Sequence, residues 1–477
     1  MRSIPISQGF AGVAAAALLL AACAVGPDYT RPAVDVPAGY KEAQGWKPAQ
    51  PRDDALPGKW WDVFGDAQLD ALMQQVDVSN QNLKIAEARF RQARALIGSA
   101  RAAYFPDLAA SASVTRNRNR NANVQASSTN YNLALDSNWE IDIWGRVRRS
   151  VEANVSATQA SAADLQAARL SAQAQLAQAY FSLRVQDAVI ALLKETVAAN
   201  ERSVQLTQNQ YDVGVAPRSD VTQALTQLKS VQAQMIDAGV QRAQLEHAIA
   251  LLIGKAPLEF SVVPAALNVQ IPATPAGLPS DLLERRPDIA GAERRVATAN
   301  AQIGVARAAY FPALTLTAAG GYQSASAANW FSVPNRFWSV GAALAETLFD
   351  GGLREAQNEA AVAAYDETVA TYRQTVLAGF QEVEDNLAAL RILEEEARVQ
   401  EEAVKAARES LALVTNQYRA GVVSYLNVVV VQTATFNNER TALAILNQRL
   451  TASIALIRAL GGGWSAMTAE NGADPRR

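Results

Sequence analysis

Two stretches of the chain carry a helical pattern of apolar and polar positions over an unusual length. Residues 146–213 contain no Gly or Pro, and residues 353–420 contain no Pro and a single Gly at position 379. A continuous helix of roughly 65 residues would be on the order of 100 Å long at 1.5 Å rise per residue. Helices of this length need partners that bury their apolar sides. The pattern therefore predicts two very long, packed helices in one chain.

A second pattern, strict alternation of apolar and polar residues, precedes the first long helix. Between residues 130 and 144 the odd positions are mostly apolar and the even positions mostly polar. This period of two predicts a strand with one face in an apolar medium and the other in water. A soluble sandwich could produce it, but about ten alternating residues with aromatics near the ends are also typical of an outer-membrane barrel strand. Weaker strand candidates are 108–115, 314–322 and 337–348, with hairpin loops predicted at 116–129 and 324–335.

Four strands are too few to close a barrel in a membrane. The smallest such barrels use eight strands, and an open sheet edge is not tolerated in lipid. If these strands span a membrane, several copies of the chain must contribute to one barrel. The same association would give the long helices their partners.

The chain also contains an internal repeat. The segment ARAAYFP at 100–106 recurs at 306–312, and YDVGV at 211–215 is matched by YRAGV at 418–422. Each long helix therefore ends at a Gly, Gly214 or Gly421, which permits the left-handed residue that closes a helix. A second helix then returns antiparallel, over about 219–253 in the first half and 424–460 in the second. The chain consists of two similar halves.

The first 23 residues have the features of a cleaved signal. Arg2 gives a positive start, residues 11–20 form a short apolar run, and LAAC at 20–23 ends it. The run is too short for a membrane span and predicts a signal peptide. An ordinary signal with an incidental Cys is the alternative. Because the only Cys stands where the bacterial lipobox that LAAC resembles would be cleaved, we expect lipidation at Cys23. Ala24, rather than Asp, follows it, and by resemblance to sorted lipoproteins this favours the outer membrane.

Composition excludes several classes of function. The chain has 477 residues, 49% hydrophobic and 19% charged, which indicates a folded protein. A net charge of −3, without a basic patch, argues against nucleic-acid binding. One Cys and one His allow no disulfide within the chain and no zinc site of the His/Cys type. Because the sequence has no Walker loop, nucleophile elbow or metal motif, we expect neither an enzyme nor a cofactor.

The chain resembles the outer-membrane efflux channels of the TolC superfamily, closest to their OprM/NodT-like lipoprotein branch. The resemblance rests on motifs spread over nearly the whole chain: CAVGPDYTRP at 23–32, WWDVFGD at 60–66, both ARAAYFP copies, WGR at 144–146, LLERRPD at 282–288, LFDGG at 348–352 and the two Gly turns. It implies a mainly α-helical homotrimer with a membrane β-barrel of 12 strands, continued by a long α-helical barrel in the periplasm, with a two-fold internal repeat in each protomer.

Under this resemblance the chain divides into six segments. These are a lipoprotein signal peptide (1–22), a lipidated extended arm (23–65), a first structural repeat of helix, two barrel strands, long helix and helix (66–255), an equatorial linker (256–284), a second structural repeat (285–460) and a flexible tail (461–477). A helical pattern is expected from the WWDVFGD cluster to about residue 103. Pro287 is expected near the first turn of a helix.

The resemblance also implies a function and its sites. The channel would be a passive exit duct for small molecules such as drugs, joined through a periplasmic adaptor to an inner-membrane pump of the resistance-nodulation-division type. The hairpin tips would dock the adaptor, and the residues assigned to them are Gly214, Val215, Ser219, Gly421, Val422 and Ser424. The alternative is that these tips are simple helix turns without a partner.

The closed aperture is expected near the same tips. Val430 stands where related channels often carry an acidic residue, so a ring of Val would gate by apolar constriction. Asp212 and Asp220 could instead form an acidic ring, or be solvated turn charges, with Asp220 or Ser219 as the cap of the following helix. Alternative functions are an outer-membrane duct for metal efflux or protein secretion, or a periplasmic coiled-coil scaffold lipoprotein without a pore. The alternating strand favours the pore, because a scaffold has no use for a lipid-facing β face.

Overall fold

A computed structural model describes residues 24–43, 59–121, 124–272 and 285–462 of the chain. The predicted signal peptide, Cys23 and parts of the predicted arm, linker and tail lie outside the described residues. The chain forms two compact units, each assembled from separate stretches. Of the described residues, the first unit contains 24–33, 89–121, 124–162 and 291–373, and the second contains 34–43, 59–88, 163–272, 285–290 and 374–462.

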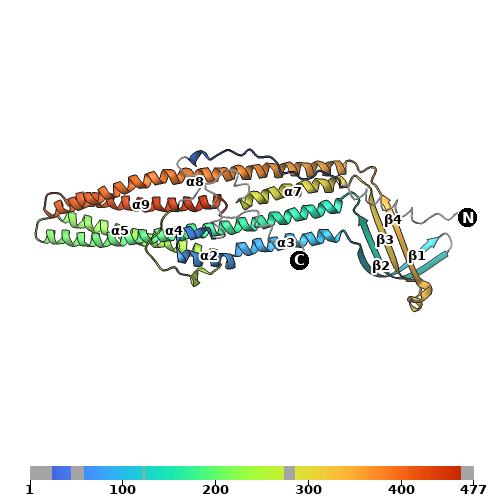
Figure 1. Cartoon of the computed structure of the whole chain (residues 1–477). Helices are drawn as coiled ribbons and strands as arrows, with labels where there is room; N and C mark the ends of the chain where they lie inside the picture. The colour runs from blue at the N-terminus through green and yellow to red at the C-terminus, as the bar shows by residue number, and fades with distance from the viewer. Residues whose placement is uncertain (1–23, 44–58, 122–123, 273–284, 463–477) are drawn as a thin grey trace. The chain divides into compact units, whose positions relative to one another are not determined.

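The first unit contains a four-stranded antiparallel sheet in the order β1-β2-β3-β4 (Figure 1). The strands are β1 (Asp107–Asn121), β2 (Val124–Ile141), β3 (Ala313–Ser324) and β4 (Arg336–Ala345). The predicted loop at 324–335 is confirmed, and it holds two short 3-10 turns, η6 (Ala327–Asn329) and η7 (Val333–Asn335). The loop predicted at 116–129 is wrong, because β1 and β2 continue through it as a paired ribbon. Most residues of this ribbon are polar, with only Val124 and Ala126 apolar in its two strands, so hydrophobic alternation did not reveal it.

One face of the sheet is apolar. Even positions of β1 lie opposite odd positions of β2, as in Val114↔Tyr131. The same odd positions of β2 lie opposite even positions of β3, as in Leu133↔Tyr322. Opposed residues of an antiparallel pair share a face, so these positions form one surface. Its large apolar side chains are more than half exposed at Leu108, Val114, Leu135, Trp338, Val340 and Leu344. Exposed apolar residues gathered on one face indicate contact with a partner or with lipid.

The two long helices are present with nearly the predicted limits. α4 (Arg146–Asp212) and α8 (Leu353–Arg419) contain 67 residues each. The returning helices α5 (Arg218–Leu252) and α9 (Tyr425–Ala459) contain 35 each, and α3 (Gln81–Ala102) and α7 (Pro287–Ala308) contain 22 each. Pro287 is the first residue of α7, as predicted. Corresponding helices of the two halves thus have equal lengths.

An aspartate marks the start of each long helix. Asp142 accepts hydrogen bonds from the backbone N–H groups of Val147 (2.9 Å) and Arg148 (2.8 Å). Asp350 accepts from the N–H groups of Gly352 (3.1 Å) and Arg354 (3.3 Å). These carboxylates satisfy donors that have no partner within the helix and favour its positive end. The helix starts are therefore fixed directly after β2 and shortly after β4.

The helical pattern predicted to run to about residue 103 is broken once. α2 (Ala67–Ser79) ends before Asn80, and α3 begins after it. The Asn80 side chain accepts from the Leu83 N–H (3.1 Å) and donates to the Leu252 carbonyl at the end of α5 (2.7 Å). Asn80 therefore caps α3 and holds it against the end of α5.

The core of the second unit surrounds the short 3-10 turn η3 (Trp60–Phe64), which precedes α2. It combines residues of η3 and α2 with the middle of α4 and the ends of α5 and α9, chiefly Trp60, Leu69, Met73, Tyr180, Phe181, Ile249, Ile253 and Ile454. Arm residues 41–43 form the turn η1 (Lys41–Ala43), whose N–H groups at Lys41 (2.6 Å) and Glu42 (2.9 Å) donate to the Glu384 carboxylate on α8. Within the described ranges, no helix has the length and apolar character needed to cross a membrane.

Candidate functional site

The hairpins α4–α5 and α8–α9 of the second unit end in the same turn. Gly214 has a positive φ of 76°, and its N–H donates to the Tyr211 carbonyl (2.9 Å) while the Val215 N–H donates to Gln210 (2.8 Å). Gly421 has φ 72°, with matching bonds to Tyr418 (2.9 Å) and from Val422 to Gln417 (2.9 Å). This pair of bonds is the Schellman motif, which requires a left-handed residue at the Gly position. The helix-closing role predicted for both glycines is confirmed.

The tips expose apolar side chains to solvent. Val213, Val215 and Val422 are each more than 70% exposed. Leu426 and Val430, in the first turns of α9, are 52% and 58% exposed. The two tips therefore present apolar side chains on their surface.

The cap considered for the first returning helix, Asp220 or Ser219, is not the one that the structure has. Pro217, not Ser219 or Asp220, is the N-cap residue of α5, and it has no side chain that could accept a hydrogen bond. Ser424 stands at the N-cap position of α9, but its side chain makes no capping bond. Pro217 replaces a side-chain cap because its fixed φ suits the turn before a helix. Ser219 and Ser424 therefore keep exposed hydroxyls at the two tips.

Two buried tyrosines lie beneath the second tip. Tyr418 and Tyr425 are 5% and 1% exposed, their ring centroids are 5.4 Å apart, and they pack with Ala224 of α5. The Tyr418 hydroxyl donates to the side-chain oxygen of Gln210 on α4 (2.5 Å). Burial, together with the negative charge of Asp220, raises the pKa of Tyr418 to about 12. Burial also raises the pKa of Tyr425, with a further contribution from Asp220.

The three predicted aperture residues have different surroundings. Asp212 is exposed at the end of α4 and accepts from the Gln208 side chain (2.8 Å). Asp220 is half-buried in the first turn of α5, near enough to Tyr418 and Tyr425 to act on their pKa values. Val430 is exposed on α9. The sequence analysis did not predict the pair of Tyr418 and Tyr425. A Tyr three residues before the Gly of both YDVGV and YRAGV was the signal that could have indicated Tyr418.

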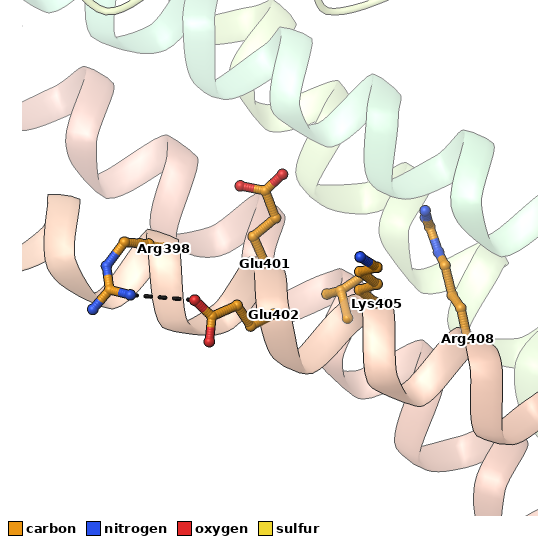
Figure 2. Close-up of a pocket in the computed structure, with 6 residues that line it drawn as sticks. Arg398, Glu401, Glu402, Lys405 and Arg408 are labelled. Atoms are coloured by element: carbon orange, nitrogen blue, oxygen red, sulfur yellow. Dashed lines mark hydrogen bonds and ion pairs between the residues drawn. The ribbon is translucent and has the colours of Figure 1, made fainter.

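A charged patch covers one side of α8 further from the tip. Arg398, Glu401, Glu402, Lys405 and Arg408 line a shallow depression of about 450 Å³ (Figure 2). Arg398 pairs with Glu402 (3.2 Å), and Arg408 pairs with Glu439 of α9 (2.6 Å). The second pair joins two neighbouring helices, whereas the first is an exposed pair within one helix and contributes little to stability.

Two buried ion-pair clusters hold the middle of the second unit, and the sequence did not predict either. Asp187 of α4 binds Arg242 of α5 (2.7 Å) and Arg184 (3.2 Å). Arg242 and Arg184 then donate to the carbonyls of Val262 (2.6 Å) and Val263 (2.9 Å) in the described part of the predicted linker. The cluster fixes the linker against both helices.

The second cluster surrounds Arg286, directly before α7. Its guanidinium binds Asp288 (2.7 Å), Glu382 of α8 (2.8 Å) and the Ala459 carbonyl at the end of α9 (3.1 Å). Glu382 thus holds Arg286, and Glu384 holds the arm. Among the described residues, no group of three or more His, Cys, Asp or Glu side chains is placed to hold a metal ion.

Comparison with known proteins identifies the class. The model of the outer membrane efflux protein family matches residues 72–255 and 278–462, so the chain belongs to this family. The antibiotic efflux pump outer membrane protein ArpC of Pseudomonas putida is 31% identical, with 98% of each chain covered. The outer membrane protein OprJ of Pseudomonas aeruginosa is 33% identical, with 94% of each chain covered. The solved structure of the outer-membrane channel OprN matches with a TM-score of 0.86 and 31% identity, covering 93% of this chain and all of that one.

The protein is therefore an outer-membrane efflux protein. It is located in the bacterial outer membrane with its helices in the periplasm, and it belongs to a family of transport proteins. The mainly helical fold matches that of the solved outer-membrane channels. The sequence resemblance to TolC-superfamily channels is confirmed.

Proposed function

We propose that three copies of this chain form a passive exit duct for small molecules in a tripartite efflux system. The observation that carries the proposal is the sheet of the first unit. Among the described residues its edge strands β1 and β4 are each paired on one side only, and one face exposes large apolar side chains. In lipid both edges must pair, and three copies would close a barrel of 12 strands. The equal helices of the two halves, as a two-fold repeat, would continue it as a helical barrel.

The segment division follows from this architecture. Residues 1–22 would be removed, and Cys23 would carry the lipid that anchors the extended arm to residue 65. The repeats 66–255 and 285–460 would each supply two strands, one long helix and the shorter helices, with 256–284 between them around the equator and a flexible tail at 461–477. Gly461 and Gly462 form the turn that closes α9, because their N–H groups donate to the carbonyls of Arg458 and Ile457 (both 3.0 Å).

The partners would meet the duct at the hairpin tips. A periplasmic adaptor would bind the apolar surface around Gly214, Val215, Gly421 and Val422, with the exposed Ser219 and Ser424 at its edge. An inner-membrane pump of the resistance-nodulation-division type would supply the energy, and the duct itself would have no catalytic role or cofactor. The name of ArpC, an antibiotic efflux pump protein, supports drugs as the exported class.

Substitution of Val215 and Val422 by Asp should abolish drug resistance in cells while leaving the trimer intact.

The closed aperture would be formed by Val430. Its exposure on α9 suits a three-fold apolar constriction, whereas the half-burial of Asp220 beside two tyrosines makes an acidic ring there less favourable. Asp212 remains available at the rim of the tip, bound to Gln208. An apolar constriction of this kind stays closed by excluding water, so a hydroxyl in its place should open it.

Single-channel conductance in a planar bilayer tests the duct and its gate together. We expect the wild-type trimer to form small, mostly closed pores and Val430→Ser to conduct several-fold more. Val240→Ser, at a 55% exposed position in the middle of α5, is the matched control and should conduct as the wild type does. A folded oligomer that neither inserts nor conducts would instead support the periplasmic scaffold.

A further inference from the structure

We propose that Arg116, Arg118 and Arg336 form a basic rim that binds the phosphate groups of the outer-leaflet lipid. The proposal rests on the barrel of the proposed function, which places the apolar sheet face against the membrane. The strand ends that join α3, α4, α7 and α8 lead to the periplasm, so the opposite ends, with the β1–β2 and β3–β4 hairpins, face the cell exterior. All three arginines lie at these outer ends.

The register places the rim on the lipid-facing surface. In β1 the even positions 108, 110, 112 and 114 belong to the apolar face, and Arg116 and Arg118 continue the same series. In β4, Arg336 pairs with Tyr322, which pairs with Leu133 of the apolar face. The side chains of these three arginines are exposed. The arginines therefore follow directly on the apolar band, on its side of the sheet.

An aromatic cluster marks the level at which the apolar band ends. Tyr131 lies 5.5 Å from Trp330, Trp330 stacks on Phe331 at 5.0 Å, and Phe331 lies 5.7 Å from Tyr322, all between ring centroids. Aromatic residues of membrane barrels gather at the boundary between hydrocarbon and headgroups. Arg116 and Arg118 lie two and four residues beyond Val114, the partner of Tyr131, or about 7 and 14 Å along the strand. That is the level of the lipid headgroups.

The charges at this end of the sheet have one sign. Residues 108–135 and 313–345 contain four Arg and no Asp or Glu, the fourth being Arg120 in the ribbon. The cross-strand neighbours of Arg116 and Arg118 are Thr129 and Ser127, which are neutral. The acidic residues next to these ranges, Asp107, Asp136, Glu140 and Glu346, lie toward the periplasmic ends of the strands. An outer end with only positive charge is complementary to phosphorylated lipid, to which long Arg side chains reach from a membrane surface.

The ribbon extends this basic surface outward. Beyond the Tyr131 level, β1 and β2 pair with each other alone for seven positions, from Thr115↔Asn130 to Asn121↔Val124. A two-stranded polar ribbon is marginally stable by itself in water. Lipid phosphate groups bound to Arg116 and Arg118 at the base of the ribbon would stabilise the ribbon beyond the point where β3 stops pairing with β2.

Binding of lipid A to the purified full-length trimer tests the proposal by native mass spectrometry. The probes are lipid A with both phosphates and the same lipid after dephosphorylation. Each juxtamembrane Arg contributes roughly a factor of five to binding of anionic lipid, so Arg116→Gln, Arg118→Gln and Arg336→Gln together should weaken binding of the phosphorylated probe roughly 100-fold. The three Arg→Lys changes should retain most of it, which separates loss of charge from loss of folding.

A control triple variant removes the same charge elsewhere. Arg89, Arg91 and Arg94 are exposed on α3, and their change to Gln should leave lipid binding as in the wild type. The proposal is overturned if the rim variant binds phosphorylated lipid A normally, or if the wild type does not distinguish the two probes. Conductance measured on the same preparations separates the two proposals, because a conducting trimer without phosphate preference contradicts only the rim.

Discussion

At the scale of single residues, the second tip depends on one buried phenol. The Tyr418 hydroxyl joins α8 to Gln210 of α4, and its ring packs on Tyr425 of α9. Its counterpart in the first tip, Tyr211, is 41% exposed. The two tips therefore share a backbone turn but differ in how the returning helix is held.

Replacing Tyr418 by Phe should loosen the second tip. The buried hydrogen bond to Gln210 is lost while the ring packing stays, which costs about 1 kcal/mol of local stability. Hydrogen–deuterium exchange of the first turns of α9 should accelerate roughly five-fold, and Tyr211→Phe should leave it unchanged.

The hydrogen bond from Tyr418 to Gln210 also depends on pH. Because the pKa of Tyr418 is raised to about 12 in the folded protein, its contribution is complete below the ordinary pKa of about 10 and is lost as the pH rises through 12. The Phe variant should lack this alkaline step.

Asp187 is the second residue on which local structure depends. It is 7% exposed and binds Arg242 and Arg184, which in turn hold the carbonyls of Val262 and Val263. Asp187→Asn removes the ion pair of the buried Arg184 and leaves Arg242 with its pair to Glu246 (3.3 Å), so we expect a loss of about 3 kcal/mol. Thermal unfolding followed by circular dichroism should show a clearly lower Tm. Asp237→Asn, at an exposed position on α5, should unfold with the wild type; equal Tm values for both variants would contradict the role of the cluster.

At the scale of elements, glycine has opposite effects at a tip and within a helix. Gly421 has φ 72° and Gly239 lies in the middle of α5, where an added Cβ meets nothing within 4 Å. Gly421→Ala forces a left-handed Ala and should cost about 1 kcal/mol, whereas Gly239→Ala should stabilise α5 by about 0.5–1 kcal/mol. In chemical denaturation, the unfolding midpoint should therefore fall for Gly421→Ala and rise for Gly239→Ala. A gain in stability for Gly421→Ala would show that the tip does not need the left-handed residue.

Most helices could be predicted from the sequence because their signals are local. The long Pro-free stretches and the glycines at 214 and 421 fixed both ends of α4 and α8 to within one residue. The break at Asn80 was missed; its side chain caps α3 at Leu83 and also bonds to Leu252, which is far away in sequence. The ribbon at 116–129 was missed because its pairing leaves no apolar alternation. The buried clusters of Asp187 and Arg286 likewise join segments that no sequence pattern connects.

At the scale of the whole molecule, the proposed membrane barrel requires other copies of the chain. β1 and β4 are the edges of a four-stranded sheet whose central strands already pair on both sides. Unpaired edges in hydrocarbon leave backbone N–H and C=O groups unsatisfied, at several kcal/mol each. Pairing of β1 in one copy with β4 in the next removes both edges at once, and repetition around an axis closes the barrel.

Engineered disulfides between β1 and β4 test this closure. Val340→Cys in β4 is combined in turn with Cys at Leu108, Ala110 and Ala112 of β1, all on the apolar face. Directly opposed residues of an antiparallel pair have Cα atoms about 4.5–5.5 Å apart, within reach of a disulfide, whereas a shift of two residues is not. We therefore expect one of the three pairs to give linked dimers and trimers on non-reducing gels, while the others give little.

The control pair places Cys at Leu133 of β2 with Val340→Cys. β2 lies between β1 and β3, so no second copy can approach it, and this pair should stay monomeric under the same oxidation. The single natural Cys, at position 23, would carry the lipid under the proposed function and would then have no free thiol in any of these variants. If none of the three β1 positions links to β4 while the trimer remains assembled, the copies associate through their helices and the barrel is not closed by these edges. If linking stops at dimers, closure by three copies is wrong even though the edges pair.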